Sequence, residues 1–519
     1  MASTFFGLTI AYSGLQAANT SLTITGHNVS NINTKGYTKQ QAGTQAADAL
    51  RTHTTYGAIG SGVVVTEISQ IRDSYYDVKY RNNMANYGQY SVKESYMGQI
   101  EDYLDEFTLN GYSQEYKNFF SAVNQLTITP GDTSAKNQLI NNAKSLADYF
   151  NTLTTNLRNV QADANNEIKD AVQQINSYAK NIAALNRQIN QIEANYGNAN
   201  DLRDKRNAMI DELSEIVNLE TSEEDMGNNV SNFSVRINGQ TLVSSYSYNT
   251  LETVARTDKK NYSDAEGLYD VQWNSGQKFD MYSTSLSGHL KGLIDIRDGN
   301  NGEHENIETD DDGNNVTDSD GNLLLTTAPA ADKTVSYKGV PYYQAQLNEF
   351  AKIFSDAVNK IMKSGYTSDG SSKGISLFVT QQNTTVMSAG NITVNPELLK
   401  NADLLAIKKE QNDGESDAKI MEELNKLQSE KIFAGGTGSY FLESIVSDMS
   451  IDSQKAVNLY KNYTDLKTSI HNQRLSIMGV DTDEEAMDMI KYQQAYNLNS
   501  KMMSVMNQIY DKLINQTGI

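Results

Sequence analysis

The sequence of 519 residues contains no cysteine, four prolines, five histidines and one tryptophan. Without cysteine the chain cannot form a disulfide, a thiolate zinc site or a cysteine nucleophile. The histidines are spread along the whole chain, at positions 27, 53, 289, 304 and 471, which argues against a histidine-rich metal site. No run approaches eighteen apolar residues, so no transmembrane helix is predicted.

Positive charge is also scarce, because 43 Lys and Arg stand against 64 Asp and Glu, for a formal net charge of −21. A chain this acidic, with no cluster of Lys or Arg, is not expected to bind nucleic acid or an anionic membrane. The first residues, MASTFFGLTIAYSGLQ, have no basic n-region and no continuous apolar core, so we expect no cleaved secretory signal. The lack of cysteine fits a cytosolic protein and a protein exported unfolded equally well.

What is present begins with an apolar pattern of helical period that runs into an Asn-rich segment, GHNVSNINTKGYTKQ (26–40). Spacings of three and four alternate, as in a helix that packs against another helix. The pattern consists of Phe5, Leu8, Tyr12, Leu15, Asn19, Leu22, Gly26 and Val29. Asn and Gly then allow local side-chain caps and left-handed backbone, so the segment is predicted to end the helix in a turn.

The longest periodic segment follows a break at residues 130–132. Apolar residues step by three or four from Leu146 to Ile192, which predicts a helix over about 134–196, roughly 90 Å long. A second, shorter helix is predicted over 198–220. Further helices are predicted over 74–126, over 342–363 and from about 397 to the end.

Patterns of period two interrupt these helices. Val63 to Ile68 is predicted to be a strand, and 375–395 a short β section. The run FSVRINGQTLVSS (233–245) surrounds Asn238-Gly239, which is the strongest short hairpin signal. The run YDVQWNSGQKFDMYS (269–283) has the same form, and Trp273 within it is expected to pack on a sheet. The predicted fold class is therefore mainly α with inserted β.

The last segment, 476–519, is the counterpart of the first. Thr482 and Glu485 have the spacing of a capping box, and the helix after them carries two apolar stripes. A single partner helix cannot cover both, so we expect the helix to be central in a bundle or buried by neighbouring subunits. The first stripe comprises Ala495, Leu498, Met502, Val505 and Ile509, and the second Tyr492, Tyr496, Met503, Met506 and Tyr510. On spacing alone, the methionines favour core packing over a partner groove.

No catalytic, cofactor-binding or metal-binding residue is predicted. The stretch HENIE (304–308) lacks the second His of a zinc peptidase helix, which favours a solvated acidic loop. Asp-rich turns ending at Gly313 and Gly321 partly match calcium loops. Their twelfth positions hold Ser319 and Thr327 where a bidentate Glu is needed, so Asp-Gly turns are the favoured interpretation.

The two ends of the chain resemble the terminal signatures of flagellar axial proteins, which are the rod, hook and hook-associated proteins. The amino-terminal match is GLQAANTSLTIT with the Asn-rich segment, and the carboxy-terminal match is GVDTDEEAMDMIKYQQAYNLNSKMMSVMNQIYDKLIN (479–515). Internal motifs resemble the FlgK family of hook-associated proteins: NDLRDKRNAMIDELSEIVNLE (200–220), GHLKGLIDIRD (288–298), YYQAQLNEFAKIFSDAVN (342–359) and NPELLKNADLLA (395–406). The stretch 299–340 departs from this pattern and looks like an insertion.

The resemblance implies a discontinuous multidomain axial protein, in which both termini form a long antiparallel helical bundle beside small β domains. In this family the terminal domain lines the inner tube of the flagellum and is largely disordered in the free subunit. The expected domains are 1–55 with 470–519 (terminal helical coiled coil), 56–225 with 341–469 (long helical bundle with short β elements) and 226–340 (β-rich, including the insertion 299–340).

The implied function is that of a structural junction protein that links hook to filament, not an enzyme. A hook or rod protein and, less favoured, an appendage-borne hydrolase using 299–340 stay open as alternatives. The resemblance implies type III export to the cell exterior, no cofactor, and association with hook protein, a second hook-associated junction protein, further copies in a ring and, indirectly, flagellin. It also implies an export chaperone of the FlgN type.

These partners define two sets of candidate residues. The assembly interface is expected at Phe5, Leu8, Tyr12, Leu15, Leu22, Val29, Leu498, Met502, Val505 and Ile509. The chaperone is expected to bind the carboxy-terminal helix at Tyr496, Met503, Met506 and Tyr510, which form one row at spacings of three, four and seven.

Overall fold

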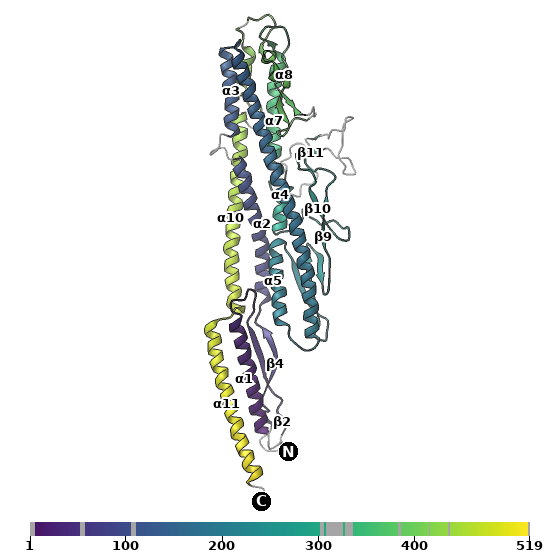
Figure 1. The fold of residues 1–519 in the computed structure, drawn as a ribbon, viewed down its shortest axis with the longest axis vertical. Coiled ribbons are helices and arrows are strands. Elements are labelled where there is room, and N and C mark those ends of the chain that lie inside the picture. The colour runs from purple at the N-terminus through teal and green to yellow at the C-terminus, as the bar shows by residue number, and fades with distance from the viewer. Residues whose placement is uncertain are drawn as a thin grey trace. The chain divides into compact units, whose positions relative to one another are not determined.

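The computed structural model describes residues 6–51, 58–104, 111–300, 306–307, 325–326, 336–381, 386–414, 416–433 and 436–516. Within these ranges the chain is mainly helical, with small antiparallel sheets between the helices, as the fold-class prediction requires (Figure 1). In the same ranges, no helix combines the length and the apolar character that a membrane span needs.

Most helices follow the prediction, but α6 (His289–Arg297) was not predicted, and the strand β16 (Ala406–Lys408) interrupts the region from about 397 that was predicted to be helical. The helices are α1 (Phe6–Ser30), α2 (Ser74–Leu104), α3 (Tyr112–Ile128), α4 (Thr133–Glu193), α5 (Asn200–Ile216), α6 (His289–Arg297), α7 (Val340–Ser364), α8 (Pro396–Lys400), a 3-10 turn η2 (Ala402–Leu404), α9 (Lys419–Lys426), α10 (Gly438–Met478) and α11 (Thr482–Asn515). The long helix predicted from the apolar period is α4, which buries the predicted apolar residues from Leu146 to Ile175.

The strands are short. They are β1 (Gln40–Ala46), β2 (Leu50–Arg51), β3 (Ala58–Ile59), β4 (Val63–Gln70), β5 (Glu220–Asp225), β6 (Ser231–Ile237), β7 (Gln240–Ser244), β8 (Ser247–Tyr248), β9 (Leu251–Ala255), β10 (Tyr269–Trp273), β11 (Asn306–Ile307), β12 (Leu325–Thr326), β13 (Tyr366–Thr367), β14 (Phe378–Thr380), β15 (Ile392–Val394) and β16 (Ala406–Lys408).

The chain divides into two compact units. Unit 1 comprises Met1–Ala85, Ile175–Thr250 and Thr464–Ile519, and unit 2 comprises Asn86–Gln174 and Leu251–Tyr463. The helices α2, α4 and α10 each contribute residues to both units. The three-part division expected from the sequence remains a prediction.

Unit 1 contains the first hairpin and the paired ends of the chain. Asn238 and Gly239 both have positive φ, at 50° and 76°, as a tight hairpin turn requires, and they join β6 to β7 in the sheet β5-β6-β7-β8. This sheet is fastened to α4 by side-chain amides. Asn186 donates to the carbonyl of Ser245 at 2.9 Å, and Asn190 donates to the carbonyl of Ser231 at 2.8 Å.

Unit 2 is built around aromatic side chains from four helices and the segments between them. Phe350 of α7 stacks on Phe433 with ring centroids 5.0 Å apart, and Phe119 of α3 meets Phe354 edge to face. Such pairs add to the stabilisation from burial, so this cluster is the core of the unit.

The second predicted hairpin turns where expected, with a short second arm. Gly276 has a positive φ of 81°, and the amide of Trp273 donates to the carbonyl of Gln277 at 2.8 Å. The arm after the turn forms one bridge, between Gln272 and Lys278, and β10 also pairs with β9. The indole of Trp273 is buried and packs against Phe279, as expected, with ring centroids 6.1 Å apart. The run Leu251–Ala255, which was not predicted to be a strand, is the longer partner, with Leu251 opposite Trp273 and Ala255 opposite Tyr269.

The predicted insertion 299–340 lies largely outside the described residues, as do most of HENIE and the Asp-Gly turns. The structure does describe its two ends in unit 2. The amide of Asn300 donates to the carbonyl of Tyr337 at 2.7 Å, so the chain returns at residue 337 to the point that it leaves at residue 300.

Candidate assembly interface on the paired terminal helices

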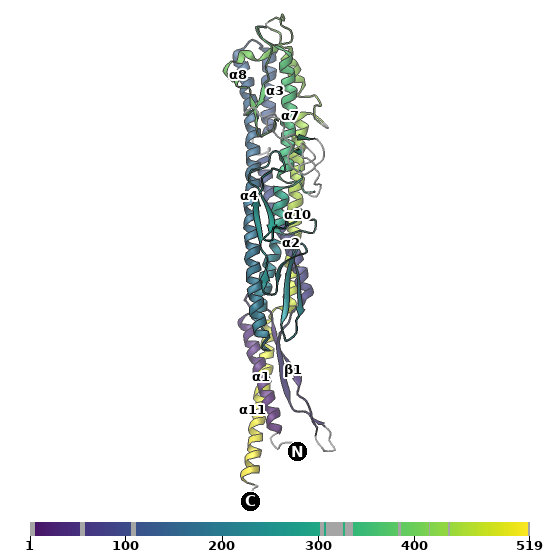
Figure 2. The ribbon, with the colours of Figure 1, turned by 90° about the vertical axis from the view of Figure 1, so that its right-hand side faces the viewer.

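The two ends of the chain pair in unit 1. Helices α1 and α11 lie side by side and antiparallel in both views (Figures 1 and 2). The β1–β4 ribbon runs along α1, where the Ser13 hydroxyl accepts a hydrogen bond from the amide of Val63 at 3.2 Å (Figure 2). The helix α1 therefore has two neighbours within its own unit.

Small residues line the face that α1 turns toward α11. The side chains of Ala11, Ala18, Ser21, Thr25 and Asn28 are buried. With Gly7 and Gly14 they form one row at alternating spacings of four and three, which we call the small-residue seam. Small side chains let two helix backbones approach closely, so larger side chains of α11 can fill the space above them.

The seam residues of α1 meet α11 in one register. The Met506 side chain occupies the space that a Cβ atom on Gly7 would need. The amide of Asn499 does the same at Gly14, with its Cγ atom 2.9 Å from the Cβ position. The Asn28 amide donates to Oε1 of Glu485 at 3.2 Å. Positions seven or fourteen residues apart on α1 therefore contact positions the same number of residues apart on α11, in the opposite chain direction.

This seam corrects the sequence pattern. The predicted seam falls one position after the buried row, and its members Leu8, Leu15, Leu22 and Val29 are half-buried while Tyr12 is 52% exposed. Phe5 lies outside the described residues. The apolar residues were the stronger signal in the sequence, but close packing between the two helices selects the smaller residues beside them.

The two ends of the Asn-rich segment, Asn28 and residues 37–40, form a polar junction on either side of an exposed turn. Asn28 is 1% exposed, and its side-chain oxygen accepts from the amide of Gln40 at 3.0 Å and from the Tyr37 hydroxyl at 2.7 Å. Lys39 binds both Glu484, at 2.7 Å, and Glu485, at 3.2 Å. These contacts tie the end of α1 to the first turn of α11.

The electrostatics of this junction follow from burial and from the carboxylates. Burial raises the pKa of Tyr37, and the nearby charges of Asp201, Asp204 and Glu485 raise it further. Burial alone would lower the pKa of Lys39, but the hydrogen bonds and charges of Glu484 and Glu485 outweigh it and raise that pKa. Lys39 therefore stays charged in this site.

The first turn of α11 also corrects the predicted capping box. The N-cap is Asp481, whose side chain accepts from the amides of Asp483 and Glu484 at 2.8 and 3.1 Å. Thr482 is the first helical residue. Glu485 is 1% exposed and faces Asn28 and Lys39. The Glu485 carboxylate therefore binds Asn28 and Lys39 instead of the backbone at the start of α11, which it would bind in a capping box.

The segment after α1 is also fixed to α5. Thr38 donates to Asp204 from its amide at 2.9 Å and from its hydroxyl at 2.6 Å. Burial raises the pKa of Asp204, and the hydrogen bonds from Thr38 oppose that rise. Lys35 forms an ion pair with Glu212 at 2.9 Å. Residues 200–220, one of the internal motifs on which the family resemblance rests, thus supply the surface that the Asn-rich segment packs against.

A second ionic group joins α10 and α2 to α5 within unit 1. Arg474 binds Asp211 at 2.6 Å and Asp77 at 2.8 Å. Arg81 reaches the other oxygen of Asp211 at 2.8 Å, and Arg72 binds Asp77 at 2.6 Å. Each charge has an opposite partner, so the group is suited to holding helices together and not to chemistry.

The first predicted stripe of α11 is exposed. Leu498 is 69% exposed, Met502 49%, Val505 46% and Ile509 49%. These four residues, which we call the outward stripe, lie on one side of the helix at spacings of three and four. An exposed row of apolar side chains such as this one is typical of an interaction surface.

The second predicted stripe faces α1. Tyr496, Met503, Met506 and Tyr510 are half-buried, and Met506 packs on Gly7. The candidate chaperone row therefore already has an intrachain neighbour. The sequence showed two stripes but not which of them α1 covers.

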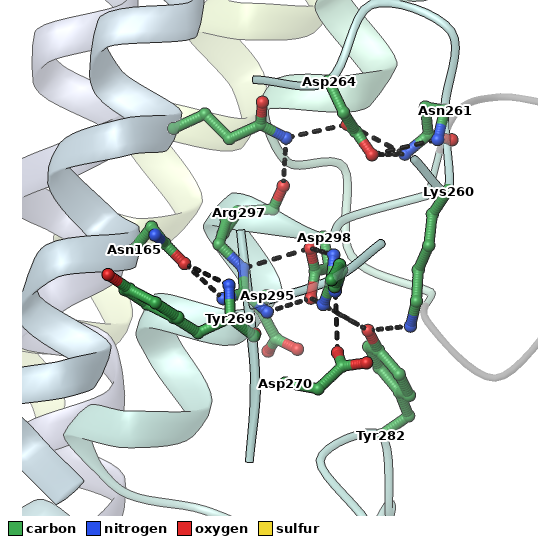
Figure 3. A network of polar contacts seen from close by, with 12 residues as sticks. Asn165, Lys260, Asn261, Asp264, Tyr269, Asp270, Tyr282, Asp295, Arg297 and Asp298 are labelled. Carbon is green, nitrogen blue, oxygen red and sulfur yellow. Dashed lines mark hydrogen bonds and ion pairs between the residues drawn. The ribbon is translucent and has the colours of Figure 1, made fainter. Parts of the chain in front are cut away.

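A group of buried charges in unit 2 forms a separate network (Figure 3). Arg297 is fully buried and donates to Asn165 at 2.8 Å and to the carbonyl of Tyr269 at 2.7 Å. Asp298 accepts from Arg256 at 2.6 Å and from the Tyr282 hydroxyl at 2.9 Å. Burial opposes ionisation of Asp298, but the charges of Arg297 and Arg256 outweigh it and hold its pKa below the usual range.

This network has the character of a structural anchor. A fully buried carboxyl group, Asp264, lies at its edge, where burial raises its pKa and the Gln161 amide binds it at 2.8 Å. The network joins α6 to α4 and to β10 (Figure 3). In the part of the chain that the structure describes, no three acidic or histidine side chains gather as metal ligands would.

Comparisons with known proteins agree with this architecture. Residues 97–378 match the model of the flagellar hook-associated protein FlgK helical domain, and residues 471–516 match the flagellar basal body rod FlgEFG protein C-terminal model. The second match contains all of α11.

Full-length relatives and a solved structure point the same way. The chain is 27% identical to flagellar hook-associated protein 1 of Bacillus subtilis strain 168, covering 100% of this chain and 99% of that one. It is 27% identical to the protein of the same name from Salmonella typhimurium, covering 97% and 98%. The flagellar hook junction protein FlgK from Burkholderia pseudomallei shares the fold, with a TM-score of 0.60 and 14% identity over 77% of this chain and 100% of that one.

Proposed function

This chain belongs to the FlgK family of flagellar hook-associated proteins, and on that premise we propose that the outward stripe of α11 is a surface through which it is built into the flagellum. It is a structural protein of the hook–filament junction. The relatives that it matches are flagellar structural proteins, not enzymes.

One observation carries the proposal for the interface. The helix α11 buries one apolar face on α1 and leaves the outward stripe exposed, so the pair has apolar area that no other described residue of unit 1 covers. Burying such side chains yields roughly 1.5–3 kcal/mol each, and a neighbouring subunit can supply the cover. Leu8, Tyr12, Leu15, Leu22 and Val29 extend this surface on α1 as proposed interface residues.

The family supports finer assignments. The paired helices α1 and α11 act as the inner-tube domain and contact hook protein on one side and a second hook-associated junction protein on the other, with flagellin reached indirectly. Further copies of the chain complete a ring. The protein works outside the cell after type III export.

The half-buried row Tyr496, Met503, Met506 and Tyr510 is assigned to the export chaperone. An amphipathic helix binds an apolar groove through anchors at helical spacing. In the folded chain α1 covers this row, so the chaperone takes the place of α1 while the chain awaits export. Chaperone binding and terminal pairing then exclude each other.

A deletion strain tests the function. We expect cells without this protein to carry hooks without filaments and to release monomeric flagellin, and the intact gene to restore filaments. Absence of hooks would instead indicate a rod or hook protein. Blotting of purified hook–filament junctions and of purified hooks with an antibody to this chain separates the same alternatives, because a junction protein is enriched in the first.

A further inference from the structure

The small-residue seam by itself does not choose one register between α1 and α11. Its members recur every three or four residues along α1, from Gly7 to Asn28, and most have side chains of similar small size. A shift of α11 by seven residues would again place large side chains over small ones. Uniform helix seams of this kind need a polar contact to fix the register.

That polar contact lies at one end of the seam. The Glu485 carboxylate is 1% exposed and receives the Asn28 amide at 3.2 Å and the Lys39 ammonium group at 3.2 Å. Asn28 is itself held by Tyr37 and by the backbone of Gln40. A shift by one heptad would leave a buried carboxylate, amide and ammonium group without these partners, which is costly.

We propose that Glu485 is a positioning residue that selects the register of α11 against α1. A shift of seven residues would move the outward stripe by roughly 10 Å along the helix axis. The register therefore sets the height at which Leu498, Met502, Val505 and Ile509 meet a neighbouring subunit. This consequence rests on the proposed function, whereas the register itself is a property of the chain alone.

A competing explanation is the short connection between α10 and α11, residues 479–481. It holds the start of α11 near the end of α10, and the Lys39 amide donates to the carbonyl of Met478 at 2.9 Å. If this connection alone fixed the register, Glu485 would be dispensable for it. The two explanations differ in what happens when the Glu485 carboxylate is removed.

Disulfide trapping separates them cleanly because the chain has no cysteine of its own. Gly14→Cys with Asn499→Cys reports the observed register. The Asn499 Cγ atom lies 2.9 Å from the Gly14 Cβ position, so the two Cβ atoms are within about 4.4 Å, in the disulfide range. Gly7→Cys with Asn499→Cys, and Gly14→Cys with Met506→Cys, report shifts of one heptad in the two directions.

Each pair is placed in the otherwise unchanged chain, in Glu485→Ala and in Glu484→Ala. Glu484 is the matched control, since it binds the same Lys39 but its side chain is 59% exposed. Flagella are sheared from complemented cells and oxidised, and intrachain crosslinks are followed by their mobility on non-reducing gels. The purified full chain serves as a second sample for any variant that does not assemble.

We expect the observed-register crosslink alone in the unchanged and Glu484→Ala chains. In Glu485→Ala it should form roughly tenfold more slowly, and at least one shifted pair should crosslink. Glu485→Gln keeps the oxygen that faces Asn28, so its observed-register crosslink should form at a rate between those of the unchanged chain and Glu485→Ala. An observed-register rate within twofold of the unchanged chain would assign the register to residues 479–481 and overturn the proposal.

Loss of all three crosslinks in Glu485→Ala would also overturn it, since Glu485 would then hold the pair together without choosing its register. Failure of the proposed function looks different. In that case, chains that carry a cysteine pair but keep Glu484 and Glu485 would be absent from reducing gels of sheared flagella. Their crosslinking as purified protein would not affect this result.

Discussion

The side-chain amide of Asn499 fills the space that a Cβ atom on Gly14 would need, with its Oδ1 and Cγ atoms 2.7 and 2.9 Å from that position. Contacts this short do not occur between real atoms, so a side chain at residue 14 requires the Asn499 amide to move aside. The same holds at Gly7 beneath Met506. Gly7 and Gly14 thus have a tertiary role that offsets their poor helix propensity.

Substituting Gly14→Val is therefore expected to loosen the terminal pair. The added side chain forces Asn499 away, and overpacking of this kind costs roughly 1–3 kcal/mol. Hydrogen exchange of the α11 amides should become faster. The control is Gly26→Ala, at a position of α1 with no atom within 4 Å of the new Cβ, which should leave exchange unchanged or slow it. Equal exchange in both variants would contradict the close packing.

The outward stripe predicts a separation between folding and assembly. Leu498→Asp or Val505→Asp places a charge on an exposed surface of the free chain, so its thermal unfolding should hardly change. In the assembled flagellum the same charge would be buried without a partner, at a cost of several kcal/mol, and filaments should be lost. Ser504→Asp is the control, because Ser504 is exposed and lies on neither stripe. Unfolding of the free Leu498→Asp chain would show that the stripe is already part of a core.

The terminal pair should be the least stable part of a free subunit. The helix α11 has α1 as its main support and one open apolar face, so its backbone is expected to open easily. Limited proteolysis of the verified monomer should first remove roughly residues 1–50 and about the last 45, before α4 is cut. Persistent protection of both ends would indicate a stable pair before assembly.

Chaperone binding should depend on one terminus only. Deleting 480–519 removes the row Tyr496, Met503, Met506 and Tyr510 and should abolish binding measured by calorimetry. Deleting 1–40 should leave binding intact or strengthen it, because α1 no longer covers the row. Binding that survives the loss of 480–519 would place the chaperone site elsewhere, and the stripes would keep only their role in assembly.

The buried network of unit 2 predicts a dependence on pH. Because Arg297 and Arg256 hold the pKa of Asp298 below its usual range, its ionised form contributes stability that is complete above about pH 4–5 and is lost as the pH falls toward the folded-state pKa. Asp298→Asn should cost roughly 3–5 kcal/mol at pH 7, because the buried Arg297 guanidinium loses its carboxylate partner while Arg256 keeps Asp270, and this difference should shrink below about pH 4.

Urea unfolding followed by fluorescence measures this effect locally, because Trp273 is the one tryptophan of the chain and lies in β10 with Tyr269, which binds Arg297. The matched control is Asp270→Asn. It removes another partner of Arg256, but its side chain is 51% exposed, so a change below about 1 kcal/mol is expected. Equal losses in the two variants would show that burial does not distinguish them.

The sequence by itself determined most of the helices, the first hairpin and the family. The 3.6-residue period of α4 and the Asn-Gly turn between β6 and β7 are local signals, and both elements form in the structure where these signals place them. The two stripes of α11 were also evident from spacing, since spacing alone fixes which residues share a face of a helix.

Tertiary structure alone decided which faces meet. The seam of α1 lies one position before the apolar pattern, because Gly7 and Gly14 allow a closer approach than leucines do. Glu485 does not form the expected capping box but binds Asn28 and Lys39, which are some 450 residues away in sequence. Contacts between residues so far apart depend on the packed geometry of the whole unit, which no local pattern encodes.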